Sequence, residues 1–148
     1  MEYLGFCRGV VTLSNLTFLS QMMLNPSDVG AFSASSRTLA DLMVETAGVR
    51  DANLVVEYGP GTGAITKSIV RSAPDPSRVV CLEINDKFVN ILRREYPQIH
   101  VRNACATEVG SQVRDMGHDS VDAIVSGLPF SIFDDVLQND ILSATYEA

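Results

Sequence analysis

The chain has 148 residues, of which 46% are hydrophobic and 20% charged, and its formal net charge is −7. This length suits one domain, and the composition indicates a folded chain rather than a disordered one. Only 11 residues are basic and they are scattered, which argues against a nucleic-acid partner because phosphate binding needs clustered Lys and Arg. No segment has 18 uninterrupted apolar residues, so we expect no membrane-spanning helix.

Residues 1–25 have the pattern of an amphipathic helix, because Leu13, Leu16 and Leu19 recur at three-residue steps among polar residues. Asn25-Pro26 would end this helix. Two interpretations stay open: the helix packs on its own domain, or it makes peripheral contact with a membrane. The polar face lacks the Lys and Arg typical of helices that bind anionic membranes, and the segment has no basic leader or clear cleavage site.

The next segment, Gly30–Ser36, has small residues and is expected to be flexible, and a helix is predicted from Arg37 to about Ala47. Ser36 would be the N-cap of this helix and Gly48 its C-terminal stop. The side of the helix that faces the core is expected to consist of Leu39, Leu42 and Met43.

The segment Asn53–Ile65 reads NLVVEYGPGTGAI, and the other elements are arranged around it. Its apolar run, Leu54–Val56, predicts a strand buried on both faces, and Ala64–Val70 predicts a helix. Between them, glycines alternate at positions 59, 61 and 63, where a backbone without Cβ atoms can adopt positive φ and approach a ligand closely. The start of the helix adds free N–H groups, so this turn is suited to an anionic or polar cofactor.

Two acids indicate which cofactor the turn favours. Glu57 gives the pattern Glu-x-Gly-x-Gly-x-Gly, and Arg78–Glu83 is a second apolar strand that ends in an acid 20 residues beyond Gly63. A carboxylate there can accept two hydrogen bonds from a ribose diol, which serves NAD and S-adenosylmethionine equally, and the pattern GxGxxA also fits NAD. The acid before the glycines resembles class I S-adenosylmethionine-dependent methyltransferases, so we favour that cofactor. A turn without any ligand is least favoured, because alternating glycines are costly in backbone entropy.

The remaining elements continue the alternation of strand and helix. They are predicted as a helix at Asp86–Tyr96, a strand at Ile99–Arg102, a helix at 106–117, a strand at Val121–Val125 and a helix at Asp134–Tyr146. The inward residues of the last helix are expected to be Val136, Leu137, Ile141 and Leu142. This order predicts an α/β fold, a parallel sheet with helices on both faces. The C-terminal ends of its strands should meet in a crevice that contains Gly59, Glu83, Asn103 and Gly127.

Five motifs in this order and spacing, GAFSASSRTLA, VVEYGPGTG, CLEIN, VRNA and SGLPF, resemble the bacterial phospholipid N-methyltransferases. These enzymes methylate phosphatidylethanolamine and are similar to the rRNA adenine dimethyltransferases. The resemblance runs from about Leu19 to the last residue. It implies a Rossmann-like class I methyltransferase fold, S-adenosyl-L-methionine as cofactor, a phospholipid or other amine as substrate, and a cytoplasmic location, peripheral at the inner face of the membrane.

The resemblance also implies roles residue by residue. The cofactor-binding set is Ser35, Glu57, Gly59, Gly61, Thr62, Gly63, Glu83, Ile84, Asn103, Ala104 and Ser126, and the set assigned to catalysis is Gly127, Leu128 and Pro129. Glu57 would support the methionine end of the cofactor, Glu83 would hold the ribose hydroxyls, and Ile84 would cover the adenine. Asn103 replaces the usual Asp, and its side-chain oxygen can still accept a hydrogen bond from the adenine amino group. Ser35 would close over the cofactor.

Position 127 separates the two classes of acceptor. Adenine dimethyltransferases carry Asn-x-Pro-Tyr or Asn-x-Pro-Phe after the fourth strand, and the Asn amide orients the base. Here that residue is Gly127, which makes no side-chain hydrogen bond to a flipped base. We therefore favour a lipid amine over RNA, and an rRNA adenine N6-dimethyltransferase-like enzyme is the alternative.

No residue is singled out as a general base or a metal ligand. His100 and His118 are expected to be structural or solvated, and Asp134-Asp135 to form an acidic first turn that suits the helix dipole. The cysteines at 7, 81 and 105 have no metal-binding spacing, which fits a reducing cytosol, and Cys81 is expected to be a small buried hydrophobe.

The domain is expected to consist of a helical segment, about 1–48, and a Rossmann-like core, about 52–148, that ends after the fourth strand and its following helix. Strands five to seven of a class I methyltransferase are not recognisable, so the fourth strand would be an exposed edge. Either the chain is truncated or a homodimer completes the sheet. We expect weak cofactor binding and poor methyl transfer from this form, and a non-catalytic S-adenosylmethionine-binding fragment remains an alternative, as does a small-molecule methyltransferase.

Overall fold

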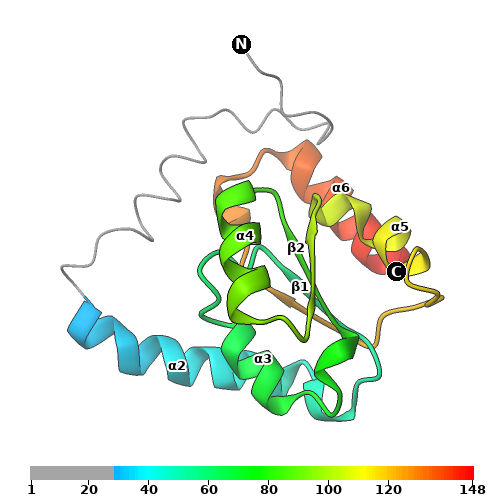
Figure 1. Cartoon of the computed structure of the whole chain (residues 1–148). Coiled ribbons are helices and arrows are strands. Elements are labelled where there is room, and N and C mark those ends of the chain that lie inside the picture. Colours follow the sequence, from blue (N-terminus) through cyan, green and yellow to red (C-terminus); the bar gives the residue numbers. More distant parts are fainter. Residues whose placement is uncertain (1–28) are drawn as a thin grey trace.

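The computed structural model describes residues 29–148, and their side chains from Arg37 onward (Figure 1). The strands are β1 (Val55–Tyr58), β2 (Val79–Glu83), β3 (His100–Asn103) and β4 (Ala123–Ser126). The helices are α2 (Val29–Thr46), α3 (Thr66–Ser72), α4 (Asp86–Glu95), α5 (Val109–Arg114) and α6 (Asp135–Glu147), with short 3-10 turns at Val49–Asp51, Pro76–Arg78, Ala106–Glu108 and Phe130–Ile132. The predicted N-terminal helix at 1–25, and with it the membrane contact, lies outside the described residues.

The strands form one parallel sheet in the order β3-β2-β1-β4, as the alternation of strand and helix predicted. Parallel strands need helical crossovers, and these cover both faces of the sheet. One face packs on α2, α3 and α4 through a buried cluster that includes Val44, Val55, Ile69, Val79 and Leu92. The other face packs on α5 and α6 through a cluster that includes Val56, Val80, Val109, Leu137 and Ile141. The predicted α/β fold class is confirmed.

The start of α2 differs from the prediction. The helix begins at Val29, so the segment Gly30–Ser36 is helical rather than a flexible lead-in, and Ser36 is inside the helix instead of being its N-cap. The small residues of this segment include alanines, which favour a helix, and its one glycine lies next to the helix start, where it costs little. The predicted stop at Gly48 is confirmed, since this residue has φ 69°.

The buried sides of α2 and α6 also differ from the prediction. Ala40 and Val44 face the core of α2, whereas Leu39 and Leu42 are each 57% exposed and Met43 is partly buried. In α6 the buried pair is Leu137 and Ile141, while the exposed apolar residues include Val136 and Leu142. In both helices the buried residues are four apart, so each helix meets the sheet along a narrow stripe rather than a broad face.

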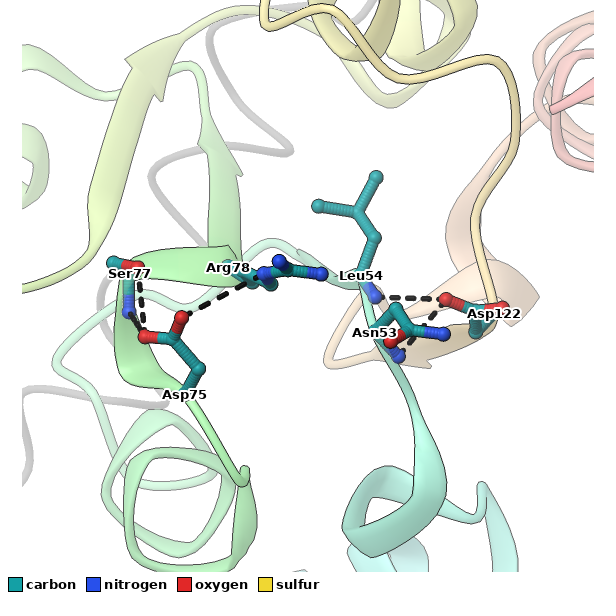
Figure 2. A network of polar contacts seen from close by, with 6 residues as sticks. All are labelled: Asn53, Leu54, Asp75, Ser77, Arg78 and Asp122. Carbon is teal, nitrogen blue, oxygen red and sulfur yellow. Dashed lines mark hydrogen bonds and ion pairs between the residues drawn. The ribbon is translucent and has the colours of Figure 1, made fainter.

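The N-terminal end of the sheet is held by carboxylates that accept backbone hydrogen bonds (Figure 2). Asp122 Oδ2 accepts from the N–H groups of Asn53 and Leu54, at 2.9 and 2.8 Å. Asp75 accepts from the backbone N–H and the hydroxyl of Ser77, at 3.0 and 2.7 Å, and lies 3.6 Å from the guanidinium of Arg78. Asp122 thereby joins the start of β4 to the start of β1, which sets the register that brings Ser126 opposite Tyr58 at the other end.

Two contacts fix helices relative to the sheet. Asp41 of α2 accepts a hydrogen bond from Ser68 of α3, at 2.6 Å, and pairs with Arg71. Tyr58, at the end of β1, shares a hydrogen bond of 3.1 Å with Thr145 of α6. The described helices include none that is both long and apolar enough to cross a bilayer.

Candidate functional site

The glycine turn follows β1 and precedes α3. Gly59, Gly61 and Gly63 all have positive φ, at 62°, 55° and 87°. A Cβ on Gly59 would lie 2.6 Å from Leu128 Cδ2, and one on Gly63 would lie 3.2 Å from Leu92 Cδ2 and from Tyr96 Cε2. The positive φ is therefore the main reason for glycine at these two positions, and a Cβ would in addition make the side chains of the loop after β4 and of α4 shift.

Glu83, at the end of β2, ties this turn to the neighbouring strand. One carboxylate oxygen accepts from the N–H of Gly61 at 3.1 Å, and the other accepts from the N–H of Asn85 at 2.8 Å. The side chain is 7% exposed, and burial raises its pKa although these hydrogen bonds act in the opposite direction. Two backbone donors leave part of the acceptor capacity of a carboxylate unused, so hydroxyl groups of a ligand can still bind here.

Glu57 of β1 is fully buried below the turn. Its Oε2 accepts from the hydroxyl of Thr66 at 2.7 Å and from the thiol of Cys81 at 3.3 Å. Its Oε1 has no hydrogen-bond partner in the described part of the chain. Burial, aided by the negative charge of Glu83, raises the pKa of Glu57 to about 7 in spite of the two donors. We call Glu57, Thr66 and Cys81 the buried acid cluster.

Two members of this cluster, Thr66 and Cys81, could not be recognised as partners of Glu57 from the sequence pattern. Cys81 is buried, as expected, but it also donates its thiol hydrogen to Glu57, and burial raises its pKa further than the charge of Glu57 does. Thr66 is the first residue of α3. The register of the sheet, which pairs Glu57 with Cys81, would have indicated the first contact once the strand order was known.

Beyond Glu83, the end of β3 provides a second polar group. Asn103 Nδ2 donates to Asp86 Oδ1 at 2.8 Å and lies 3.4 Å from the carbonyl oxygen of Ile84. This contact orients the amide so that Asn103 Oδ1 remains available to a donor. Ile84, which is 37% exposed, presents an apolar surface beside it, whereas Ala104 is buried.

The loop after β4 closes on the glycine turn. The N–H of Gly127 donates to the carbonyl oxygen of Tyr58 at 2.8 Å, and the N–H of Leu128 donates to Ser126 Oγ at 3.3 Å. A Cβ at position 127 would lie 2.9 Å from the carbonyl oxygen of Gly59. Because that contact is to backbone, the close approach of the two loops requires glycine at this position.

The continuation of this loop is held by a residue that the sequence did not indicate. Gln138 of α6 donates through Nε2 to the carbonyl oxygens of Phe130 and Phe133, at 3.0 and 2.9 Å. The rings of these two phenylalanines lie 5.9 Å apart. Pro129 precedes the 3-10 turn at Phe130–Ile132, so the loop leaves the end of β4 in a defined direction.

The structure thus brings the predicted residues of all four strands together at the C-terminal end of the sheet, with the exposed Thr62 at the tip of the glycine turn. The side chain of Ser35 lies outside the described ones, so its role stays a prediction. His100 is exposed at the start of β3, the end opposite to Asn103, and His118 lies after α5, so neither reaches the strand ends. Asp134 caps α6 by accepting from the N–H of Leu137 at 2.8 Å, as expected of an acidic first turn.

The hydrogen-bonding groups at the C-terminal end of the sheet are complementary to a ligand that has hydroxyl groups and a cation. Glu83 retains acceptor capacity, the unpartnered Glu57 oxygen is buried and anionic when ionised, and the turn presents a backbone without side chains. In residues 29–148 no group of three or more His, Cys, Asp or Glu is arranged to hold a metal ion. S-adenosylmethionine fits this set, because it has a ribose diol, an ammonium group and a sulfonium.

Comparisons with known proteins point the same way. The family model for ribosomal RNA adenine dimethylase matches residues 27–135. An ornithine lipid N-methyltransferase from Singulisphaera acidiphila is 31% identical over 131 residues, which cover 84% of this chain and 66% of the relative. A probable ribosomal RNA small subunit methyltransferase A from Methanopyrus kandleri is 28% identical over 118 residues, covering 74% of this chain and 39% of the relative. The chain thus spans less than two thirds of either relative.

A solved structure confirms the fold. An O-methyltransferase from Bacillus cereus, crystallised in complex with SAH, superimposes with a TM-score of 0.56 at 19% identity, covering 73% of this chain and 51% of that protein. At this identity the similarity concerns the arrangement of strands and helices alone.

Proposed function

Because the chain belongs to the ribosomal RNA adenine dimethylase family of S-adenosylmethionine-dependent methyltransferases, we propose that it carries the cofactor site of an N-methyltransferase whose acceptor is a lipid amine. Phosphatidylethanolamine is the first acceptor to test. The cytoplasmic location, peripheral at the inner face of the membrane, and a homodimer through the edge of β4 are parts of the same proposal.

The cofactor, when bound, supplies an electrophilic methyl group. Glu83 would accept hydrogen bonds from the ribose hydroxyls, Ile84 would cover the adenine, and Asn103 would accept from its amino group. Glu57 would face the ammonium of the methionine part below the glycine turn. The exposed fraction of Ile84 and the free Oδ1 of Asn103 support these assignments.

The chain's own contribution to transfer is alignment and exclusion of water. An amine that attacks a methyl group in a straight line needs a positioned acceptor more than it needs covalent help from the protein. The loop Ser126–Pro129, which closes on Gly59, would position that amine. An ethanolamine ammonium must first lose a proton, and neither histidine lies at the C-terminal strand ends to accept it.

The observation that carries the choice of acceptor is the contact at Gly127. An asparagine there would bring its Cβ to 2.9 Å from the Gly59 carbonyl oxygen, so this chain cannot present a base-orienting amide without moving the glycine turn. The ornithine lipid N-methyltransferase supports the lipid choice. The relatives also include ribosomal RNA methyltransferases, so the comparisons do not support the expectation that nucleic acid is excluded as a partner.

Incubation with S-adenosylmethionine labelled in the methyl group tests this proposal. Vesicles with phosphatidylethanolamine should become labelled, whereas phosphatidylcholine vesicles, which lack a free amine, and small-subunit ribosomal RNA should not. If the RNA becomes labelled and the lipid does not, the acceptor is RNA, and the rRNA adenine alternative replaces this proposal. Binding of S-adenosylhomocysteine without any transfer would identify a non-catalytic cofactor-binding fragment, and binding of NADH alone would exclude the methyltransferase.

A further inference from the structure

The buried acid cluster has an acceptor that nothing in the described chain satisfies. Glu57 is 0% exposed and has an unpartnered Oε1, while both of its donors contact Oε2. A buried carboxylate without a counter-charge is unfavourable and tends to take up a proton instead. The question is therefore which group neutralises Glu57.

No cation in the described part of the chain does so. The ion pairs in residues 37–148 are Asp41 with Arg71 and Asp75 with Arg78, and both lie on exposed side chains. The titratable groups that face Glu57 are Cys81 and Glu83 of β2 and Tyr96 after α4, whose ring packs against Gly63. All of these are acids, and Thr66 of α3 is neutral. Every neighbour that titrates is therefore neutral or negative.

We propose that Glu57 is a proton-linked cofactor anchor: in mildly acidic solution the free protein holds a proton on Glu57, and this proton is released to solvent when the ammonium of the cofactor binds. In this step the carboxyl O–H bond breaks, the proton goes to the buffer, and the carboxylate pairs with the ammonium. The proposal rests on the proposed function, because it takes S-adenosylmethionine or its demethylated product as the ligand. Cofactor affinity then depends on pH.

The direction of this dependence follows from linkage. The pKa of Glu57 is about 7 in the free protein, and an adjacent ammonium would lower it in the complex. Below pH 7 binding must expel a proton, so affinity falls about tenfold for each pH unit. Above pH 7 most of Glu57 is already ionised in the free protein, so affinity should level off there. It should fall again only in alkaline solution, where the ammonium of the ligand loses its own proton.

The test uses calorimetry of the 148-residue chain with S-adenosylhomocysteine, which has the ammonium but no sulfonium. Titrations at pH 6 in two buffers of different ionisation enthalpy count the protons released. We expect about 0.9 proton per ligand, and an affinity roughly five- to tenfold weaker than at pH 7.5. Adenosine, which has the ribose and the base but no ammonium, is the matched control ligand and should release none.

Three variants locate the proton. Glu57→Gln should release no proton and lose the decline of affinity below pH 7. Glu83→Gln should bind more weakly at every pH but still release the proton, because Glu57 is intact. Thr66→Val removes a hydrogen bond that favours the carboxylate, so the decline should begin at higher pH.

The outcomes are separable. Binding of S-adenosylhomocysteine without proton release at pH 6 would overturn this inference and leave the proposed function intact. Two results would assign the proton to the ribose site and would also overturn this inference. One is proton release when adenosine binds, and the other is loss of proton release in Glu83→Gln but not in Glu57→Gln. Absence of binding at every pH would overturn both. If Glu57→Gln fails to fold, the number of protons released by the wild-type chain still decides whether binding is linked to a proton.

Discussion

At the N-terminal end of the sheet Asp122 is exposed and accepts two backbone hydrogen bonds. At the C-terminal end Glu57 is fully buried, and one of its oxygens has no partner among the described residues. The first carboxylate accepts from the two residues that precede β1 and so joins the starts of β1 and β4. The second is held by Thr66 and Cys81 in an environment that disfavours its charge. A carboxylate at a strand end can therefore either stabilise the fold or remain available to a ligand, and its burial and its hydrogen-bond partners distinguish the two roles.

The largest effect should come from Glu57→Gln, and it depends on pH. Burial raises the pKa of this acid from 4.5 to about 7, so its ionisation costs folding free energy as pH rises through that interval. At pH 8 the variant should be more stable than wild type by about 3 kcal/mol, and at pH 5 by less than about 1 kcal/mol. Urea unfolding at both pH values measures this, and a pH-independent difference would contradict it.

The glycine turn offers a second test at the same end. In Gly59→Ala the new residue would have to adopt positive φ, and its Cβ would lie 2.6 Å from Leu128 Cδ2. We expect the free energy of unfolding to fall by about 2 to 3 kcal/mol. Gly48→Ala is the matched control: its φ is 69°, but nothing lies within 4 Å of the new Cβ, so the loss should be about 1 kcal/mol. Equal losses in thermal or urea unfolding would show that Leu128 does not pack on Gly59.

At the opposite end, Asp122→Ala should cost about 1 to 2 kcal/mol, because two backbone N–H groups lose their acceptor and only one of them is partly buried. The proton release on binding S-adenosylhomocysteine at pH 6 should remain as in wild type. A changed proton count would mean that the two ends of the sheet are coupled.

The smallest effects are expected on the exposed leucines. Leu39→Gln in α2 and Leu142→Gln in α6 should each change the free energy of unfolding by less than about 0.5 kcal/mol, since both side chains are more than half exposed. Val44→Ala, a smaller change at a buried site in α2, should cost more than either. Losses above about 1.5 kcal/mol at the leucines would show that these side chains are buried in solution.

Local patterns in the chain predicted much of the candidate site. The alternating glycines, Glu57 before them and Glu83 at the end of the next apolar run depend on short spacings along one strand-turn-helix unit. The buried acid cluster could not be predicted in this way, because Glu57 and Cys81 are 24 residues apart and meet only when β1 pairs with β2. Gln138, which holds the loop after β4, likewise acts across a turn whose conformation the sequence pattern did not indicate.

Periodicity and backbone freedom within short segments were enough to predict the α/β alternation, the strand ends that meet at one end of the sheet, and the glycine turn with its two acids. Three other features follow only from the packed fold: which faces of α2 and α6 are buried, why position 127 must be glycine, and that no described residue supplies a counter-charge to Glu57. Each of these depends on the distance between elements far apart in the chain, and such distances are set by packing rather than by local preference.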